Sequence, residues 1–254
     1  MRRFARVLVD GAPHFAHVQG EELVLWAGAP WDAAAMPTSR RVAMSEAVWL
    51  PVTPASKVVA VGQNYRKHAA EMGKPVPAEP LLFLKPSTAL NAHQSPIVLP
   101  PESAEVHHES ELGLVIGRRL SRATEAEAAL GIFALTCFND VTARDIQRRE
   151  VQHTRGKGFD TFACAGPFLV EGLESDDLRV ACYVNGELRQ EGRTSDMVFS
   201  PAKLVSFMSH AMTLLPGDLI ATGTPSGVGP LRHGDCVEVD IEGVGRLSNP
   251  VVAG

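Results

Sequence analysis

Short apolar runs, many of them rich in β-branched residues, recur along most of this chain and are separated by Gly and Pro turns. Runs of this length predict β-strands, and the turn residues between them predict reversals of the chain. Helical segments do not alternate with these strands, so a doubly wound parallel sheet is disfavoured. The sequence therefore favours a mixed α/β, β-rich fold, built as a roll or barrel.

The N-terminal segment predicts a small β-meander. Its strands would cover residues 6–9, 14–18 and 23–26, with Gly-containing turns between them. Prolines at positions 30, 37, 51 and 54 then indicate an irregular link. We therefore expect two domains, a small N-terminal β domain over residues 1–54 and a larger domain over residues 55–254.

The larger domain should contain more strands than helices. The expected strands cover residues 57–61, 81–84, 96–99, 112–116, 168–171, 179–184, 219–222 and 236–241. The expected helices cover residues 64–73, 124–130, 142–149 and 201–212. A capping-box pattern begins at Thr124, and Asn185-Gly186 is a strong hairpin-turn signal.

Composition disfavours several classes of partner. The chain has 254 residues and a formal net charge of −5, and no basic stripe interleaves with aromatic residues, so nucleic acid is not expected to bind. No run approaches the ~20 apolar residues of a membrane span, so no membrane association is expected. The cysteines are widely spaced, which predicts buried thiols of a cytoplasmic protein; they are Cys137, Cys164, Cys182 and Cys236.

Two glutamates lie two positions apart in the run of residues 107–117, which is apolar and β-branched toward its end. In a strand Glu109 and Glu111 would share one face, with their Cα atoms about 7 Å apart. Carboxylates that close repel unless a cation, a proton or solvent separates them. An all-oxygen pair favours Mg²⁺, Mn²⁺ or Ca²⁺ over zinc. The alternative is an exposed strand with solvated acids.

Asp140 follows an apolar stretch and precedes the helix expected over residues 142–149. There it could add a third oxygen ligand from a different element, which leaves coordination positions for water and substrate. The alternative is an N-cap, a common role for Asp before a helix.

Further candidates for chemistry lie in short segments. Lys157, flanked by glycines, could approach a bound anion, or could be a solvated loop lysine. The Gly-rich segment 222–230 could present backbone N–H groups to a carboxylate, or could be a simple tight loop. His68 and Glu71 are three positions apart on an expected helix, so they would face the same way as a general base and its orienting acid, or as a surface pair.

Together these segments resemble the fumarylacetoacetate hydrolase family. The matching pieces, in order, are VGQNYRKHAAEM, FLKPSTAL, HHESELGLVIG, FNDVTARDIQ, GKGFDTF, TGTPSGVG and VDIEGVGRLSNPV. Any one of them is weak evidence, but all of them in the right order are specific. The preceding meander is similar to the small N-terminal domain of many bacterial members, and the pattern resembles acylpyruvases and 2-hydroxyhepta-2,4-diene-1,7-dioate isomerases.

The resemblance implies a mixed β-roll catalytic domain, usually homodimeric, that holds Mg²⁺ or Mn²⁺ and no organic cofactor. The implied metal ligands are Glu109, Glu111 and Asp140. The implied catalytic residues are His68, Glu71 and Lys157, the first two as a lid pair that activates water in hydrolytic members. The implied substrate-binding residues are Tyr65, Lys85, Gln147, Gly223 and Thr224. Gln63 departs from the pattern, because some acylpyruvate-cleaving members have Arg there.

The leading interpretation is hydrolytic cleavage of a C–C bond in an acylpyruvate-like or fumarylacetoacetate-like diketo acid, through a metal-stabilised enolate. His68 and Glu71 favour hydrolysis, since only hydrolysis requires an activated water. The alternative is an isomerase, decarboxylase or tautomerase of 2-oxo acids in aromatic-compound catabolism. A third reading, from a different class, is a non-catalytic metal-dependent dicarboxylate-binding protein.

Overall fold

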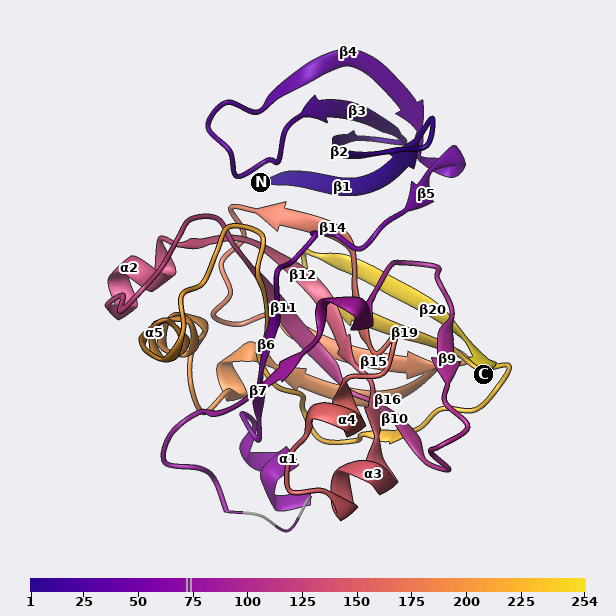
Figure 1. Ribbon diagram of the computed structural model, residues 1–254, viewed down its shortest axis with the longest axis vertical. Helices are drawn as coiled ribbons and strands as arrows, with labels where there is room; N and C mark the ends of the chain where they lie inside the picture. The colour runs from indigo at the N-terminus through magenta and orange to yellow at the C-terminus, as the bar shows by residue number, and fades with distance from the viewer. Residues whose placement is uncertain (72, 74) are drawn as a thin grey trace.

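The computed structural model describes residues 1–71, 73 and 75–254 (Figure 1). Its N-terminal part is an antiparallel meander of β1 (Arg2–Val9), β2 (Ala12–Gln19), β3 (Glu22–Ala27) and β4 (Met36–Ala43), and the short β5 (Val48–Trp49) pairs with β1. The three predicted strands are confirmed. The predicted irregular link is wrong where β4 forms. Pro37 is tolerated there because β4 is an exposed edge strand, where a missing N–H donor costs little.

The meander continues into the main sheet of the larger part, because β1 pairs antiparallel with β14. Figure 1 shows the meander above this sheet, joined to it along β14. The sheet also contains β6 (Val58–Gly62), β7 (Leu81–Lys85), β8 (Leu90–Asn91), β11 (Ser110–Ile116), β12 (Ile132–Asp140), β14 (Ala163–Glu171) and β17 (Leu219–Ala221). The two-domain division at residue 54 stays a prediction.

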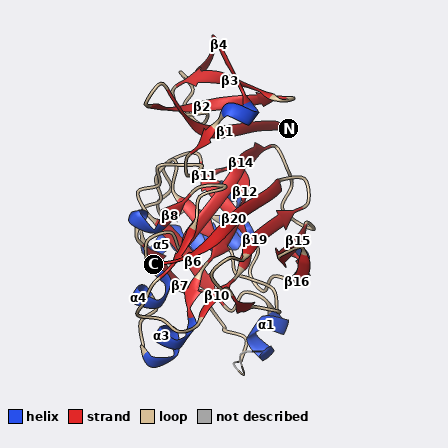
Figure 2. Ribbon diagram, turned by 90° about the vertical axis from the view of Figure 1, so that its right-hand side faces the viewer, coloured by secondary structure: helices blue, strands red, loops and turns tan. Residues whose placement is uncertain are grey.

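A second sheet packs against the main one. It runs in the order β16 (Glu187–Arg193), β15 (Arg179–Val184), β19 (Cys236–Ile241), β20 (Gly245–Ala253) and β9 (Ile97–Leu99). Leu112 and Leu114 of β11 share one buried cluster with Val180 and Val239 of the second sheet, so the main core lies between the two sheets (Figure 2). A small third sheet is formed by β10 (Val106–His108), β13 (Thr142–Ala143) and β18 (Gly229–Pro230).

The helices are short and lie outside the sheets. They are α1 (Arg66–Glu71), α2 (Glu125–Ala129), α3 (Arg144–Arg149), α4 (Thr154–Lys157) and α5 (Pro201–Ala211), with 3₁₀ turns η1 (Met44–Glu46), η2 (Ser87–Ala89) and η3 (Thr194–Asp196). The predicted capping box at Thr124 is present. Met72, in the predicted helix 64–73, lies outside the described residues. Both figures show α1, α3 and α4 at the end of the molecule away from the meander.

The mixed, strand-rich fold class is confirmed. β12 and β20 are not among the predicted strands. β12 is buried on both faces over most of its length, so it lacks the alternation that distinguishes a strand from a buried helix. Cys236 is exposed, so the prediction of buried thiols is wrong for that residue, while the other cysteines are buried and all are free. Within the described residues, no helix has both the length and the apolar character needed to cross a membrane.

Candidate metal and active site

Three carboxylates meet where β11 begins and β12 ends. Glu109 lies in the break between β10 and β11, Glu111 follows on β11, and Asp140 ends the neighbouring strand β12. Oxygens of the three lie within 4.8 Å of one another, and all three residues are buried. The exposed-strand alternative is therefore wrong. The N-cap alternative for Asp140 is also wrong, because α3 starts later and has Ala143 as its N-cap.

Buried cations surround this acidic triad, defined as Glu109, Glu111 and Asp140. The Nζ atom of Lys157 lies 2.7 Å from Glu109 Oε2 and 2.6 Å from Asp140 Oδ2. Arg144 pairs with Glu109, and Lys85 pairs with Asp140. The solvated-loop alternative for Lys157 is wrong, since it ends helix α4 and is 3% exposed.

These ion pairs give the acids of the triad different pKa values. Burial alone raises the pKa of Glu109, but the charges of Lys157 and Arg144 outweigh burial and hold that pKa well below its usual range. Burial raises the pKa of Glu111 well above its usual range, and the charges of Asp140 and Glu109 raise it further. Because burial disfavours the charged form of a lysine, it lowers the pKa of Lys85, and the charge of Asp140 offsets part of that effect.

The donor set fits an oxygen-preferring divalent cation. Among the described residues, Glu111 is the member of the triad without an ion pair, and its Oε2 accepts a hydrogen bond from the Gly223 backbone N–H at 2.7 Å. A buried carboxylate that faces two others and has no cationic partner is costly. Hard cations such as Mg²⁺, Mn²⁺ and Ca²⁺ prefer such carboxylate oxygens. Glu109, Glu111 and Asp140 are therefore the residues that would hold the metal.

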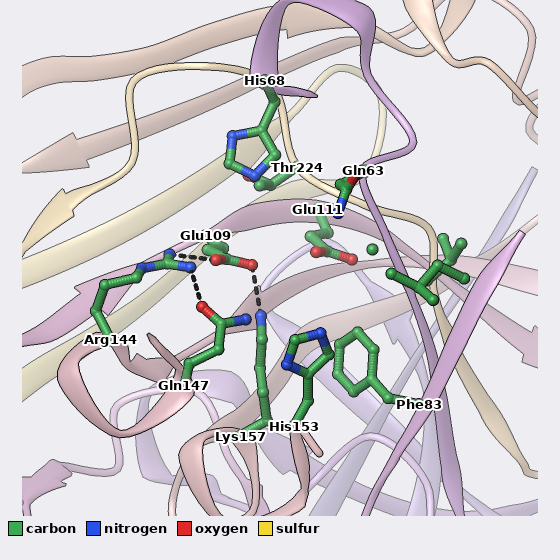
Figure 3. A pocket seen from close by; sticks show the side chains of 13 residues that line it. Gln63, His68, Phe83, Glu109, Glu111, Arg144, Gln147, His153, Lys157 and Thr224 are labelled. Atoms are coloured by element: carbon green, nitrogen blue, oxygen red, sulfur yellow. Dashed lines mark hydrogen bonds and ion pairs between the residues drawn. The ribbon is translucent and has the colours of Figure 1, made fainter. Parts of the chain in front are cut away.

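A histidine faces Glu109 and Glu111 of the triad from the other side of a cavity (Figure 3). His68 lies on α1 and is 6% exposed. Its Nδ1 is 3.0 Å from Glu71 Oε2, and Glu71 Oε1 accepts from the Gly227 backbone N–H at 3.0 Å. The pair is therefore built into the site, and the loop after β17 holds its acid.

The structure brings most of the predicted residues together. The cavity lining includes His68, Glu109, Glu111, Gln147, Lys157 and Thr224. Tyr65, Lys85 and Gly223 are not among the described residues that line this cavity. Tyr65 and Lys85 are at most 2% exposed, Lys85 is bound to Asp140, and Gly223 holds Glu111. Substrate binding by these three residues stays a prediction.

Other residues of the site are missing from the predicted set. Arg144 binds both Glu109 and, at 2.6 Å, the Gln147 Oε1 atom. The sequence could have indicated Arg144, because Arg144 and the predicted site residue Gln147 are three positions apart on a helix and so share a face. Phe83 and His153 also line the cavity. Gln63 lines it with a backbone φ of 60°, a left-handed conformation that no sequence pattern marked.

The larger part of the chain and the N-terminal meander each match a known family pattern. The pattern described as fumarylacetoacetate (FAA) hydrolase C-terminal matches residues 57–252, and the one described as Rv2993c-like, N-terminal matches residues 2–51. An oxaloacetate tautomerase of Bacillus subtilis, YisK, is 38% identical over 96% of this chain and 84% of its own length. The mitochondrial oxaloacetate tautomerase FAHD2B of Bos taurus is 43% identical over 82% of this chain and 70% of its own.

A solved structure agrees over the whole length. The 2-hydroxyhepta-2,4-diene-1,7-dioate isomerase of Mycobacterium marinum is 40% identical, with a TM-score of 0.92 over 100% of this chain and 99% of that one. The agreement extends from the N-terminal meander through the sheets that carry the acidic triad. This chain is therefore a member of the fumarylacetoacetate hydrolase family, and an enzyme of that family.

Proposed function

We propose that this enzyme is divalent-metal-dependent and moves a proton within a small 2-oxo acid, by keto–enol tautomerisation or double-bond isomerisation of a 2-oxo dicarboxylic acid. The observation that carries the proposal is the position of His68 across one cavity from Lys157, Glu109 and Glu111 (Figure 3). The activities in the names of the tautomerase and isomerase relatives support the same class of reaction.

The side chains can do this chemistry as follows. An enol forms when a base removes a proton from the carbon beside a carbonyl while positive charge stabilises the carbonyl oxygen. Glu71 holds Nδ1 of His68, which leaves Nε2 to exchange the proton. The Lys157 ammonium supplies fixed positive charge, because burial opposes its charge but Asp140 and Glu109 outweigh that and raise its pKa. A divalent cation on the triad would supply further positive charge for the substrate oxygens.

The charges around the cavity favour a dianionic substrate. With the triad ionised, its three carboxylates are matched by Lys85, Lys157 and Arg144. With a divalent cation held by the triad, these buried groups would carry a surplus of two positive charges. A 2-oxo dicarboxylate carries two negative charges and would neutralise that surplus, which matters because unpaired buried charge is expensive.

Hydrolytic C–C cleavage of an acylpyruvate is the second candidate. It is favoured by the hydrogen bond between His68 and Glu71 at 3.0 Å, the arrangement of a base that could deprotonate water. Tautomerisation needs only the same base and no attacking water, so the pair serves both reactions. We rank hydrolysis second because the relatives compared above carry the names of isomerases and tautomerases.

One assay separates the candidates. Protein stripped with EDTA is reloaded with Mg²⁺ or Mn²⁺, and the conversion of enol to keto oxaloacetate is followed by ultraviolet absorbance. We expect metal-dependent acceleration over buffer, and a loss of about 100-fold or more in His68→Ala, while His210→Ala, an exposed control on α5, keeps the wild-type rate. Conversion at the buffer rate with either metal would reject the proposal. Faster hydrolysis of acetylpyruvate by the same sample would favour the second candidate.

We further propose that the enzyme is a homodimer, as the family resemblance implies. Size-exclusion chromatography with light scattering should give twice the 27.2 kDa chain mass. A species of single-chain mass at micromolar concentration would reject this part of the proposal.

A further inference from the structure

A buried glutamine lies on a strand that is otherwise at the surface. Gln190 is 1% exposed, while the other residues of β16, all of which are described, are exposed or half-buried. The pairing of β16 with β15 shifts at this point, since Cys182 pairs with Gln190 and the next residue pairs with Leu188, which leaves Arg189 unpaired. Such a bulge redirects side chains, and bulges are common beside active sites.

The amide of Gln190 is fully bonded. Its Oε1 accepts from the Ser110 backbone N–H at 3.0 Å and from His108 Nδ1 at 2.9 Å. Its Nε2 donates to Thr224 Oγ1 at 2.7 Å and to the Pro225 carbonyl at 2.8 Å. A backbone N–H can only donate and a backbone carbonyl can only accept, so these two partners fix the orientation of the amide.

The two segments that Gln190 joins both carry parts of the site. Ser110 lies between the two glutamates of the triad, and its carbonyl accepts from the Thr224 hydroxyl at 2.8 Å. Thr224 follows Gly223, whose N–H binds Glu111. The same loop, residues 222–230, also presents the Gly227 N–H to Glu71. One side chain outside the described cavity lining thus ties the strand with the acids to the loop that holds Glu111 and Glu71.

We propose that Gln190 is a positioning residue of this site. It holds the start of β11 and the loop 222–230 in the relation that places Gly223 on Glu111, Thr224 in the cavity wall and Gly227 on Glu71. Its loss lets the loop move away from the strand, which loosens both the acidic triad and the His68–Glu71 pair. The effect on turnover rests on the proposed function, whereas the effect on metal affinity does not.

Two substitutions in the full-length chain test this. Gln190→Glu keeps acceptors for Ser110 and His108 but loses both donors, and Gln190→Met removes the whole hydrogen-bonding group at similar size. Leu188→Ala, on the same strand and 48% exposed, is the matched control. The measurements are the Kd for Mn²⁺ from an EPR titration of metal-stripped protein, kcat and KM for oxaloacetate, and the thermal midpoint.

We expect Mn²⁺ affinity to fall by 10- to 100-fold in both Gln190 variants, as for other groups that orient metal ligands. We expect kcat to fall by a similar factor with a smaller change in KM, and the control to match wild type. A Kd and a kcat within twofold of wild type, even with a lower thermal midpoint, would overturn the proposal. If Gln190→Met does not fold, Gln190→Glu decides alone. Weakened Mn²⁺ binding would support this proposal even if wild-type protein turned over no 2-oxo acid, a result that would reject only the proposed function.

Discussion

At the scale of single residues, the site is a set of buried charges that hold one another. Lys157 contacts two of the three acids, and Arg144 and Lys85 each contact one. Alternation along a strand was enough to predict that Glu109 and Glu111 meet. The cations that pair with them could not be predicted in the same way, because Lys85, Arg144 and Lys157 come from separate elements that only the fold brings together.

Replacing Lys157 should affect stability and turnover differently with and without metal. In Lys157→Met, Glu109 and Asp140 lose a shared cation, and breaking a buried ion pair costs about 3–5 kcal/mol. We expect metal-free protein to lose free energy of unfolding of that order, Mn²⁺ to restore part of it, and kcat to fall by about 100-fold. Urea titrations and the oxaloacetate assay measure these effects. Lys203→Met, which breaks an exposed pair, should cost less than about 1 kcal/mol; equal losses in both variants would contradict the account.

Stability at acid pH should depend partly on His93. Burial lowers the pKa of His93 to about 4, below its ordinary value near 6.5. Between pH 6.5 and 4, His93 is therefore protonated in the unfolded chain but stays largely neutral in the folded protein. The free energy of unfolding consequently falls as the pH falls through that window. The ring is partly exposed, which reduces the effect to about 1–2 kcal/mol.

The variant His93→Asn tests this contribution. An Asn oxygen can replace Nδ1 as acceptor for the Ser248 N–H, now at 3.1 Å, without a titrating group. Urea unfolding at pH 7 and pH 4.5 should show a smaller loss of stability in the variant than in wild type. The same loss in both proteins would contradict the assignment.

At the scale of elements, the loop 222–230 carries more of the site than its composition suggested. The sequence predicted that its glycines could offer N–H groups to a carboxylate, and the acceptors are the protein's own Glu111 and Glu71. The sequence could not show which carboxylates these N–H groups bind. The position of the loop depends on Gln190 of β16, and this residue lies beyond the predicted turn Asn185-Gly186. Local hairpin signals locate a turn, but not the side chain that the strand buries.

Gly227 should be irreplaceable for two reasons. It has a φ of 98°, and an added Cβ would lie 2.3 Å from the Arg189 carbonyl oxygen. Gly234, with a φ of 90°, has open space around its Cβ position. Gly234→Ala should therefore cost only the conformational term of about 1 kcal/mol, whereas Gly227→Ala should cost more and also lower kcat, because Glu71 loses its N–H partner. Chemical denaturation and the oxaloacetate assay compare the two, and equal effects would contradict this role.

At the scale of the whole molecule, the N-terminal meander and the larger part that follows it, here called the roll (residues 55–254), share one sheet and one packed cluster. Phe4 of β1 is fully buried, pairs with Leu169 of β14, and makes an edge contact with Trp26 at 5.0 Å between ring centroids. The sequence predicted the meander from its turns. It could not predict this junction, because pairing between distant strands leaves no local pattern.

Truncating Phe4 should therefore weaken the whole protein. We expect Phe4→Ala to lower the free energy of unfolding by about 3–5 kcal/mol through the cavity it leaves, within one cooperative transition. Leu8→Ala, on the same strand but 37% exposed, should change it by less than about 1 kcal/mol. Calorimetry and urea unfolding measure both. A first transition confined to the meander, with the roll at wild-type stability, would show that the two parts are not coupled.

The central claim is that Glu109, Glu111 and Asp140 together hold one divalent cation. The most direct test is a crystal structure of the protein soaked with Mn²⁺ and oxalate, with data collected for the anomalous signal of manganese. The account predicts one strong anomalous peak with an oxygen of each of the three acids among its ligands. A manganese site elsewhere, or the three carboxylates without a metal at saturating Mn²⁺, would contradict it.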